Sequence, residues 1–466
     1  MVSRRPSYTT KHAKRTSQRV QESTLGTHVE RRYQPSNGRR VQQNRYTQTI
    51  LRRARIKRIA IIVVVAVVII GLAIAAGMFV FRNVVGGELS LKDSNAKDSL
   101  VPVKTGEPYY TLVSAEMGAV AEPLENSGPD VLLLARVDPQ NKSLTLVNIP
   151  SSLQLTFDNK TESIASIAQS GDAGLIKALS TFMKIDISHI VKVQNENDLS
   201  RLVDALGGVS VDVAQEIDDP HAGYICLPAG EKKLNGEEAL VFLRAQNITY
   251  GSEDQLVNEL KFGKGIVASV FSKSSGGIGS SVEAIGPYIQ TDLSLGDLEA
   301  LYSWLGGVSE NDISTAILPG YFTAVTNVKG FGEDKFVSTA SEVSSFIKEL
   351  EENVSMDAES VRKGELASPS SFTVSVQNGT SIEGAASSAA NVLKSAGFKV
   401  GDVGNAEQPV YDETLVVYKG SDPDGPARAR AVIDAMKCGR VVNGDAYYTF
   451  DSDILLIIGA DNKPVS

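Results

Sequence analysis

The side chains best suited to metal or nucleophile chemistry are scarce in this chain. It has two cysteines, Cys226 and Cys438, far apart in the sequence, and it has no CxxC string or Cys/His cluster. A structural zinc ion needs about four such ligands at close spacing, so we expect no zinc site. We interpret the cysteines as two unrelated buried thiols. An interdomain disulfide is the alternative in an oxidising compartment.

Histidine, serine and glycine motifs indicate no familiar hydrolase or nucleotide site. Only His189 and His221 of the four histidines follow the apolar segment 59–81, and no Gly-x-Ser-x-Gly string occurs. That string marks a nucleophile elbow, so an unrelated membrane-tethered hydrolase lacks support. His189 lies in a string typical of a strand, which favours a structural role. Residues 274–281 (SSGGIGSS) lack the lysine of a phosphate loop and predict a flexible loop.

Segment 59–81 is apolar throughout and reads IAIIVVVAVVIIGLAIAAGMFVF. A helix of about twenty such residues spans the ~30 Å hydrocarbon core of a bilayer. Five basic residues lie within 52–58, whereas Arg82 alone follows the segment closely. The positive-inside rule then places the N-terminus in the cytoplasm and the C-terminal domains outside. We therefore predict a single-pass anchor in the cell membrane. The segment is too long and too far from the N-terminus for a cleaved signal peptide.

The net charge of -9 hides two parts of opposite sign. Residues 1–58 hold sixteen Lys and Arg against two acidic residues, a net charge of +14. The totals of 46 basic and 55 acidic residues leave 30 and 53 for the remainder, a net charge of -23. The basic part is poor in apolar residues, so we expect a disordered cytoplasmic tail. The acidic remainder argues against a nucleic-acid partner, because such proteins present a basic face.

Strands and helices are expected to alternate beyond the anchor. The apolar runs 131–139 and 143–150, joined by a turn, predict a hairpin. Further expected elements are a strand at 209–213, helices at 173–182, 196–206, 254–271, 293–305 and 342–354, and then strands at 372–380, 414–420 and 454–459 with helices at 382–396 and 427–436. This order predicts a mixed α/β or α+β sandwich followed by a small α/β domain.

The predicted organisation has six parts. They are a disordered tail (1–58), a transmembrane helix (59–81), a polar stalk (82–107), a first outer domain (108–354), a linker (355–371) and a C-terminal domain (372–466).

Both outer domains resemble known families. The strings at 129–150, 188–213 and 223–246, above all LVDALGGVSVDV and LNGEEALVFLR, resemble the LytR-CpsA-Psr (LCP) family of bacterial cell-envelope proteins. The strings at 374–400 and 413–420 resemble the LytR C-terminal domain. The resemblance implies an LCP-like sandwich of mixed sheet and helices, with a small C-terminal α/β domain.

The resemblance also implies a chemistry. LCP proteins transfer glycopolymers from a polyprenyl-pyrophosphate carrier to peptidoglycan, with arginines and Mg²⁺ against the pyrophosphate. It places Asp130 and Arg244 as catalytic residues, Asp130 and Glu116 as Mg²⁺ ligands, and Lys261 as a replacement cation for the lipid phosphate. Cations are needed there because phosphoryl transfer moves a highly charged group. Mg²⁺ suits carboxylates that share it with phosphate oxygens.

This chain departs from the family at several charged positions. The arginine expected after Glu116 is absent, and Ser151-Ser152 stands where the family has Arg-Asp. Three more expected arginines are replaced by neutral amides, at Gln246, Gln255 and Asn258. Each lost guanidinium removes a permanent charge and up to five donors.

Two hypotheses follow from the resemblance and its departures. The first is a membrane-anchored protein of cell-wall biogenesis that binds polyprenyl-(pyro)phosphate-linked glycopolymer and transfers it to peptidoglycan. The second is a catalytically impaired relative that acts as a lipid-glycan or wall-binding scaffold.

Overall fold

The computed structural model describes most of the chain beyond residue 90. The described residues are 91, 93–118, 130–246, 248–272, 277–323, 335–354, 356–358, 366–407, 411, 413–444 and 448–462.

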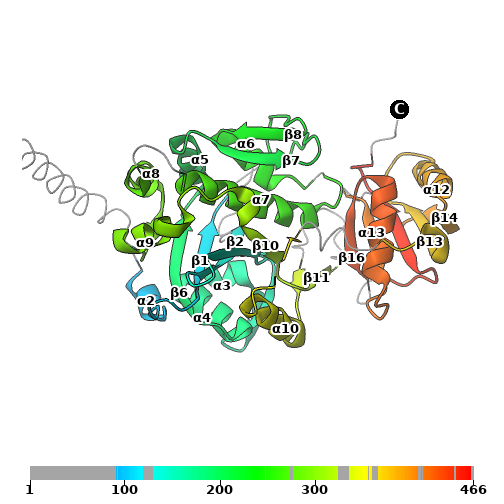
Figure 1. Cartoon of the computed structure of the whole chain (residues 1–466). Helices are drawn as coiled ribbons and strands as arrows, with labels where there is room; N and C mark the ends of the chain where they lie inside the picture. The colour runs from blue at the N-terminus through cyan, green and yellow to red at the C-terminus, as the bar shows by residue number, and fades with distance from the viewer. Residues whose placement is uncertain are drawn as a thin grey trace, which may run out of the picture. The chain divides into compact units, whose positions relative to one another are not determined.

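A six-stranded sheet forms the centre of the first outer domain (Figure 1). Its strands, in spatial order, are β10 (Ser314–Ile317), β3 (Ser143–Asn148), β2 (Val131–Asp138), β1 (Tyr109–Ala115), β6 (Ile187–Val193) and β9 (Gln290–Thr291). The predicted hairpin is confirmed, because β2 and β3 pair antiparallel. Strands β1 and β6 pair parallel, so their carboxyl ends lie at the same edge of the sheet.

Helices cover both faces of this sheet, as Figure 1 shows. One face carries α5 (Glu196–Ala205), α6 (Gly236–Arg244), α7 (Ser252–Val270), α8 (Gly277–Ile285) and α9 (Leu295–Leu305). The other carries α2 (Ser94–Asp98), α3 (Ile164–Gln169), α4 (Asp172–Met183) and α10 (Ala340–Glu351). Side chains of β2 alternate between the two cores, with Leu133 in the first and Leu132 in the second. All eight residues of β2 are therefore buried, as expected for a strand covered on both faces.

Local sequence fixes where the helices of the first face begin and end. Asn195 caps α5 by accepting from the backbone N of Asp198, and Gly207 with a φ of 74° follows its last turn. Asn235 and Glu238 form a capping box at the start of α6. Two hairpins complete the domain: β4 (Gln154–Phe157) with β5 (Lys160–Ser163), and β7 (Val209–Val213) with β8 (Gly230–Leu234).

A second sheet forms the centre of the C-terminal domain and also includes two short strands from residues 321–337 of the first outer domain. The strands follow the order β12 (Lys335–Val337), β11 (Tyr321–Thr323), β16 (Arg440–Asn443), β15 (Leu415–Tyr418), β17 (Ile454–Ile458), β13 (Thr373–Asn378) and β14 (Lys399–Asn405). Helices α12 (Ala385–Ser395) and α13 (Gly425–Met436) pack on one face. The predicted alternation of strands and helices is confirmed, and β14 and β16 are strands that the sequence patterns did not reveal.

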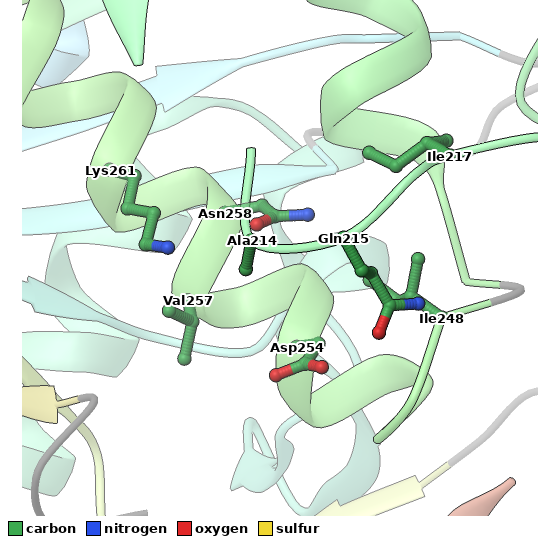
Figure 2. Close-up of a pocket in the computed structure, with 8 residues that line it drawn as sticks. All are labelled: Ala214, Gln215, Ile217, Ile248, Asp254, Val257, Asn258 and Lys261. Atoms are coloured by element: carbon green, nitrogen blue, oxygen red, sulfur yellow. The ribbon is translucent and has the colours of Figure 1, made fainter. Parts of the chain in front are cut away.

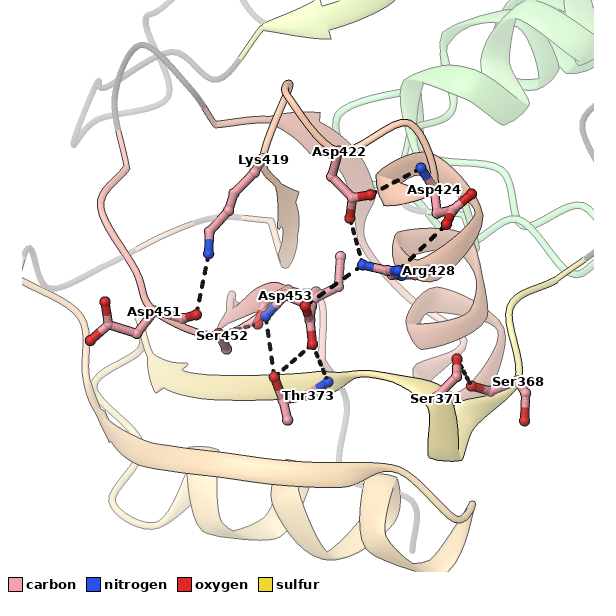
Figure 3. Close-up of polar contacts among 11 residues, drawn as sticks. Ser368, Ser371, Thr373, Lys419, Asp422, Asp424, Arg428, Asp451, Ser452 and Asp453 are labelled. Atoms are coloured by element: carbon pink, nitrogen blue, oxygen red, sulfur yellow. Dashed lines mark hydrogen bonds and ion pairs between the residues drawn. The ribbon is translucent and has the colours of Figure 1, made fainter.

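A polar cluster fixes the start of α13 (Figure 3). Arg428 pairs with Asp422 at 2.7 Å, Asp424 at 3.5 Å and Asp453 at 3.6 Å. Asp453 in turn accepts from the backbone N and the hydroxyl of Thr373 at 2.7 and 2.8 Å. The guanidinium therefore ties the loop after β15, the start of α13 and the starts of β13 and β17 together.

The structure corrects two expectations. Residues 277–281 belong to α8 and not to a flexible loop, because Ile278, Val282 and Ile285 give a buried helical stripe that outweighs the glycines. Both cysteines are free, but Cys226 is exposed and so is not the buried thiol we expected.

The N-terminal predictions fall largely outside the described residues. The tail 1–58 and the anchor 59–81 lie there entirely. Among the residues that are described, no helix has the length and apolar character needed to cross a bilayer. Within the predicted stalk, Ser94–Asp98 forms α2, and Ala96 is buried in the core beside α4.

Candidate functional site

The candidate site lies where β1 and β6 end and β2 begins. The backbone N of Glu116, just after β1, donates to the carbonyl of Val193 at 3.3 Å, and the N of Asp130 donates to the carbonyl of Ala115 at 3.1 Å. Helix α5 starts at Glu196, three residues after β6. The strand ends thus bring three acidic side chains to one edge of the sheet. Such an edge, at the carboxyl ends of parallel strands, is a common place for ligands in α/β folds.

Asp130 and Arg244 hold the same short backbone segment from two sides. Asp130 Oδ2 accepts from the backbone N of Met117 at 2.9 Å and of Gly118 at 3.1 Å. Arg244 Nε donates to the carbonyls of Met117 at 2.7 Å and Gly118 at 3.1 Å. Arg244 Nη2 also forms an ion pair with Glu196. The structure therefore brings Asp130 and Arg244 together around the two residues that follow Glu116.

Burial is the largest influence on the pKa values of Glu116 and Asp130. It raises the pKa of Asp130, while the backbone N–H groups of Met117 and Gly118 and the charge of Arg244 oppose the rise. Burial also raises the pKa of Glu116, Lys192 lowers it and the negative charge of Asp130 raises it further. The two carboxylates therefore lie close enough to repel each other. A bound cation between them would relieve that repulsion.

These two carboxylates fit Mg²⁺ better than a metal held by protein alone. In the part of the chain that the structure describes, no group of three or more His, Cys, Asp or Glu side chains could hold a metal ion. Mg²⁺ usually takes one or two carboxylates and completes its shell with water and substrate phosphate. Glu116 and Asp130 would supply that protein share, although the backbone N–H groups already occupy Asp130 Oδ2.

The three amides that replace expected arginines have different surroundings. Gln255 and Asn258 on α7 are buried, and their side-chain nitrogens donate to the carbonyls of Leu243 at 3.0 Å and Phe242 at 3.5 Å. They thereby satisfy two of the last carbonyls of α6, which lack partners within their own helix. Gln246 is exposed, and its Nε2 donates to Gln255 Oε1 at 2.8 Å.

Helix α7 also carries a buried acid, Glu259. Glu259 on α7 accepts from Asn148 Nδ2 at 2.7 Å, and both side chains are almost fully buried. Burial raises the pKa of Glu259 to about 8, with a further rise from the charge of Asp130. Glu259 therefore keeps its proton to a higher pH than an ordinary glutamate does.

Lys261 lies apart from these contacts, against β7. Its Nζ donates to the carbonyl of Asp212 at 3.3 Å. Figure 2 shows it beside a small pocket together with Gln215, Asp254 and Asn258. The volume of this pocket is ≈ 20 Å³, room for about one or two water molecules.

Two protein-family models match this chain. The model of the LytR_cpsA_psr family matches residues 122–358, just over half of its length. The chain belongs to the LytR_cpsA_psr family. The model described as "LytR cell envelope-related transcriptional attenuator" matches residues 371–461. Both matches confirm the resemblances drawn from the motifs.

Individual relatives of the LytR_cpsA_psr family are distant. The cell wall biosynthesis protein LcpA of Corynebacterium glutamicum is 22% identical over 422 residues, 80% of this chain and 79% of the relative. The polyisoprenyl-teichoic acid–peptidoglycan teichoic acid transferase TagU of Enterococcus faecalis is 26% identical over 214 residues, 44% of this chain and 68% of the relative. The crystal structure of Bacillus subtilis TagV has a TM-score of 0.47 at 20% identity and covers 54% of this chain and 99% of that one.

Sequence reasoning missed two charged side chains at the candidate site. Glu196 pairs with Arg244, and Lys192 near the end of β6 forms a 2.8 Å ion pair with Asp172. Only their positions in the sequence could have indicated these two residues. A charged residue at the end of a predicted strand, or at the start of the helix that follows it, can reach the edge of the sheet. His189, in contrast, binds Asp292 through Nδ1 at 2.7 Å, which ties β6 to the residue after β9.

Proposed function

We propose that this protein binds polyprenyl-(pyro)phosphate-linked glycopolymer at the Glu116–Asp130–Arg244 edge and transfers the polymer to peptidoglycan. The contact that carries the proposal is the clamp of Asp130 and Arg244 around residues 117–118. A clamped guanidinium costs less entropy when it binds a phosphate, because its position is set beforehand. The names of the relatives LcpA and TagU, which refer to the cell wall and to teichoic acid, support this function.

Arg244 is suited to hold a phosphate oxygen. Its contacts use Nε and Nη2, and among the described residues Nη1 has no partner, so its two N–H donors remain for a ligand. The ion pair with Glu196 and the two carbonyls keep the guanidinium from swinging away. Phosphoryl transfer depends mostly on this kind of positioning and charge stabilisation.

Glu116 and Asp130 would hold Mg²⁺ beside that phosphate. When bound, the ion neutralises charge on the phosphoryl oxygens. The backbone N–H groups of Met117 and Gly118 fix Asp130 Oδ2, and Asp130 Oδ1 is the oxygen left for the ion. The raised pKa values of both acids mean that a proton competes with the metal as the pH falls.

The same proposal includes the anchor. A single-pass helix at 59–81 would hold the acidic domains outside the cytoplasm, next to a lipid-linked substrate and the wall. The opposite charges of 1–58 and the remainder support this arrangement.

Ligand binding by the full-length protein in detergent tests the proposal. We expect calorimetric titration with geranyl pyrophosphate, a short polyprenyl pyrophosphate, to show Mg²⁺-dependent binding. Loss of a charged hydrogen bond in Arg244→Gln should weaken binding about tenfold or more. Arg201→Gln is the matched control, because Arg201 is exposed on the neighbouring helix α5. Equal affinities of the wild type and Arg244→Gln would refute the site.

Transfer is tested separately with the same variants. The wild type, incubated with a polyprenyl-pyrophosphate-linked glycan and peptidoglycan, should yield a phosphodiester-linked product that mass spectrometry detects. Ligand binding without any product would support the scaffold alternative instead.

A further inference from the structure

Two cations approach the acidic edge from opposite faces of the sheet. Arg244 comes from α6, in the layer that includes α5 and α7. Lys192 lies on β6 two residues after Ile190, which packs in the core beside α4. Because side chains alternate along a strand, Lys192 projects toward the α4 face. Lys192 lies opposite Ser114 of β1, two residues before Glu116, so it stands at this edge, and its charge lowers the pKa of Glu116.

The ion pair that Lys192 makes is one that can open. Lys192 Nζ lies 2.8 Å from Asp172 Oδ1, and the two side chains are 25% and 10% exposed. Asp172 is the first residue of α4. A helix N-terminus stabilises a carboxylate on its own, so Asp172 would keep a favourable partner if Lys192 moved. Four rotatable bonds give the lysine the reach for such a move.

The site also needs a second positive group. Arg244 is already paired with Glu196, and Asp130 and Glu116 add further negative charge. Of the amides at expected arginine positions, Gln255 and Asn258 are occupied by the carbonyls of α6. A pyrophosphate carries at least two negative charges, so one paired arginine leaves it poorly compensated even beside Mg²⁺.

We propose that Lys192 is a second phosphate-binding residue, which exchanges Asp172 for a phosphate oxygen of the bound ligand. This inference rests on the proposed function and assigns a residue that the family motifs did not indicate. In this proposal, Asp172 and the phosphate of the ligand compete for Lys192. A purely structural ion pair would not compete with the ligand, so the two cases can be distinguished by experiment.

Paired substitutions in the full-length protein test the exchange. Lys192→Gln should weaken binding of geranyl pyrophosphate in the presence of Mg²⁺ about tenfold, the loss of one charged hydrogen bond. Asp172→Asn should leave the affinity unchanged or increase it, because it frees the lysine. Lys192→Arg should keep most of the affinity. Lys177→Gln, an exposed lysine of α4, is the control and should bind as the wild type does.

The outcomes separate this inference from the proposed function. If Lys192→Gln and Asp172→Asn lose affinity equally, and lose thermal stability equally, the pair is structural and the inference fails. If Lys192→Gln binds like the wild type while Arg244→Gln does not, the inference fails and the proposed function stands. If neither substitution changes the affinity, both fail. A weaker salt dependence of binding in Lys192→Gln than in the wild type would support the exchange further, because one fewer ion pair forms.

Discussion

Gly118 shows how tightly single residues are packed at the site. It has a φ of 61°, and a Cβ built on it would collide with the carboxylate of Glu196 and approach Arg244 Nη2 to 3.3 Å. Gly118→Ala should therefore displace the Glu196–Arg244 pair and weaken geranyl pyrophosphate binding about tenfold. The unfavourable backbone should also lower the free energy of unfolding by about 1 kcal/mol.

Gly106 provides a matched control for that prediction. Its φ is 79°, and no atom lies within 4 Å of an added Cβ. Gly106→Ala should lose about the same stability as Gly118→Ala, as measured by thermal unfolding, and should keep full affinity. If the two variants bind equally well, the glycine has no bearing on the site.

Gln246 offers a gain of function at the residue scale. It is exposed and stands where the family has an arginine, two residues after Arg244. A guanidinium there costs little desolvation and adds a positive charge near the phosphate. We predict that Gln246→Arg binds geranyl pyrophosphate several-fold more tightly, by calorimetry, at unchanged thermal stability. Gln246→Glu should have the opposite effect. Tighter binding in neither variant, or in both, would mean that position 246 does not face the ligand.

The candidate site could be predicted only in part at this scale. Asp130 and Arg244 were found because they sit inside recognisable strings, and the structure brings them together around residues 117–118. Glu196 and Lys192 lie inside the string at 188–213, but the resemblance gives them no role, and only the parallel pairing of β1 with β6 brings them to the same edge. Lys261 was chosen because the resemblance implies cations on this helix, but a resemblance along the helix does not say which neighbour each face meets.

Helix α7 joins the site to the sheet through a buried acid, which gives stability a pH dependence. Glu259 has a pKa of about 8 when folded, against 4.5 for an ordinary glutamate. The unfolded chain therefore loses this proton first as pH rises. The contribution of Glu259 to the free energy of unfolding is complete below about pH 4.5. It decreases as the pH rises to about 8, by at most about 1.4 kcal/mol per pH unit.

Glu259→Gln should remove this dependence. Glutamine stays neutral and can still accept from Asn148, so the variant should gain stability over the wild type between pH 6 and pH 8. The difference in melting temperature between the two proteins, measured from pH 5 to pH 9, isolates the contribution of residue 259. Glu259→Ala should lose stability at every pH, because it leaves a cavity and an unpaired amide. A difference that stays constant with pH would contradict the assignment.

Elements were easier to predict than their arrangement. The helix at 196–206 and the strand at 209–213 were visible because Leu199, Leu202 and Val203 recur at helical spacing before a pair of glycines. Strand order was not visible, since β1 pairs with both β2 and the distant β6. Helix α8 was missed because its glycines mask an apolar stripe.

At the scale of the whole molecule, the two thiols can show on which side of the membrane the domains after residue 81 lie. Cys226 is exposed, whereas burial raises the pKa of Cys438 to about 12 and leaves almost no thiolate to react. If the outer domains lie outside the cytoplasm, a membrane-impermeant maleimide should label intact cells at Cys226. Cys226→Ser should abolish the labelling, and Cys438→Ser should leave it unchanged. Labelling that appears only after the membrane is permeabilised would overturn the proposed topology.

The amides at the start of α7 restrict which side chains these positions accept. Gln255 and Asn258 complete the last turn of α6, and both are buried. An arginine at either position would place a permanent charge where little solvent reaches. Arginine at these two positions would thus be disfavoured on stability alone. The fold accepts arginine more readily at Gln246, whose side chain faces solvent.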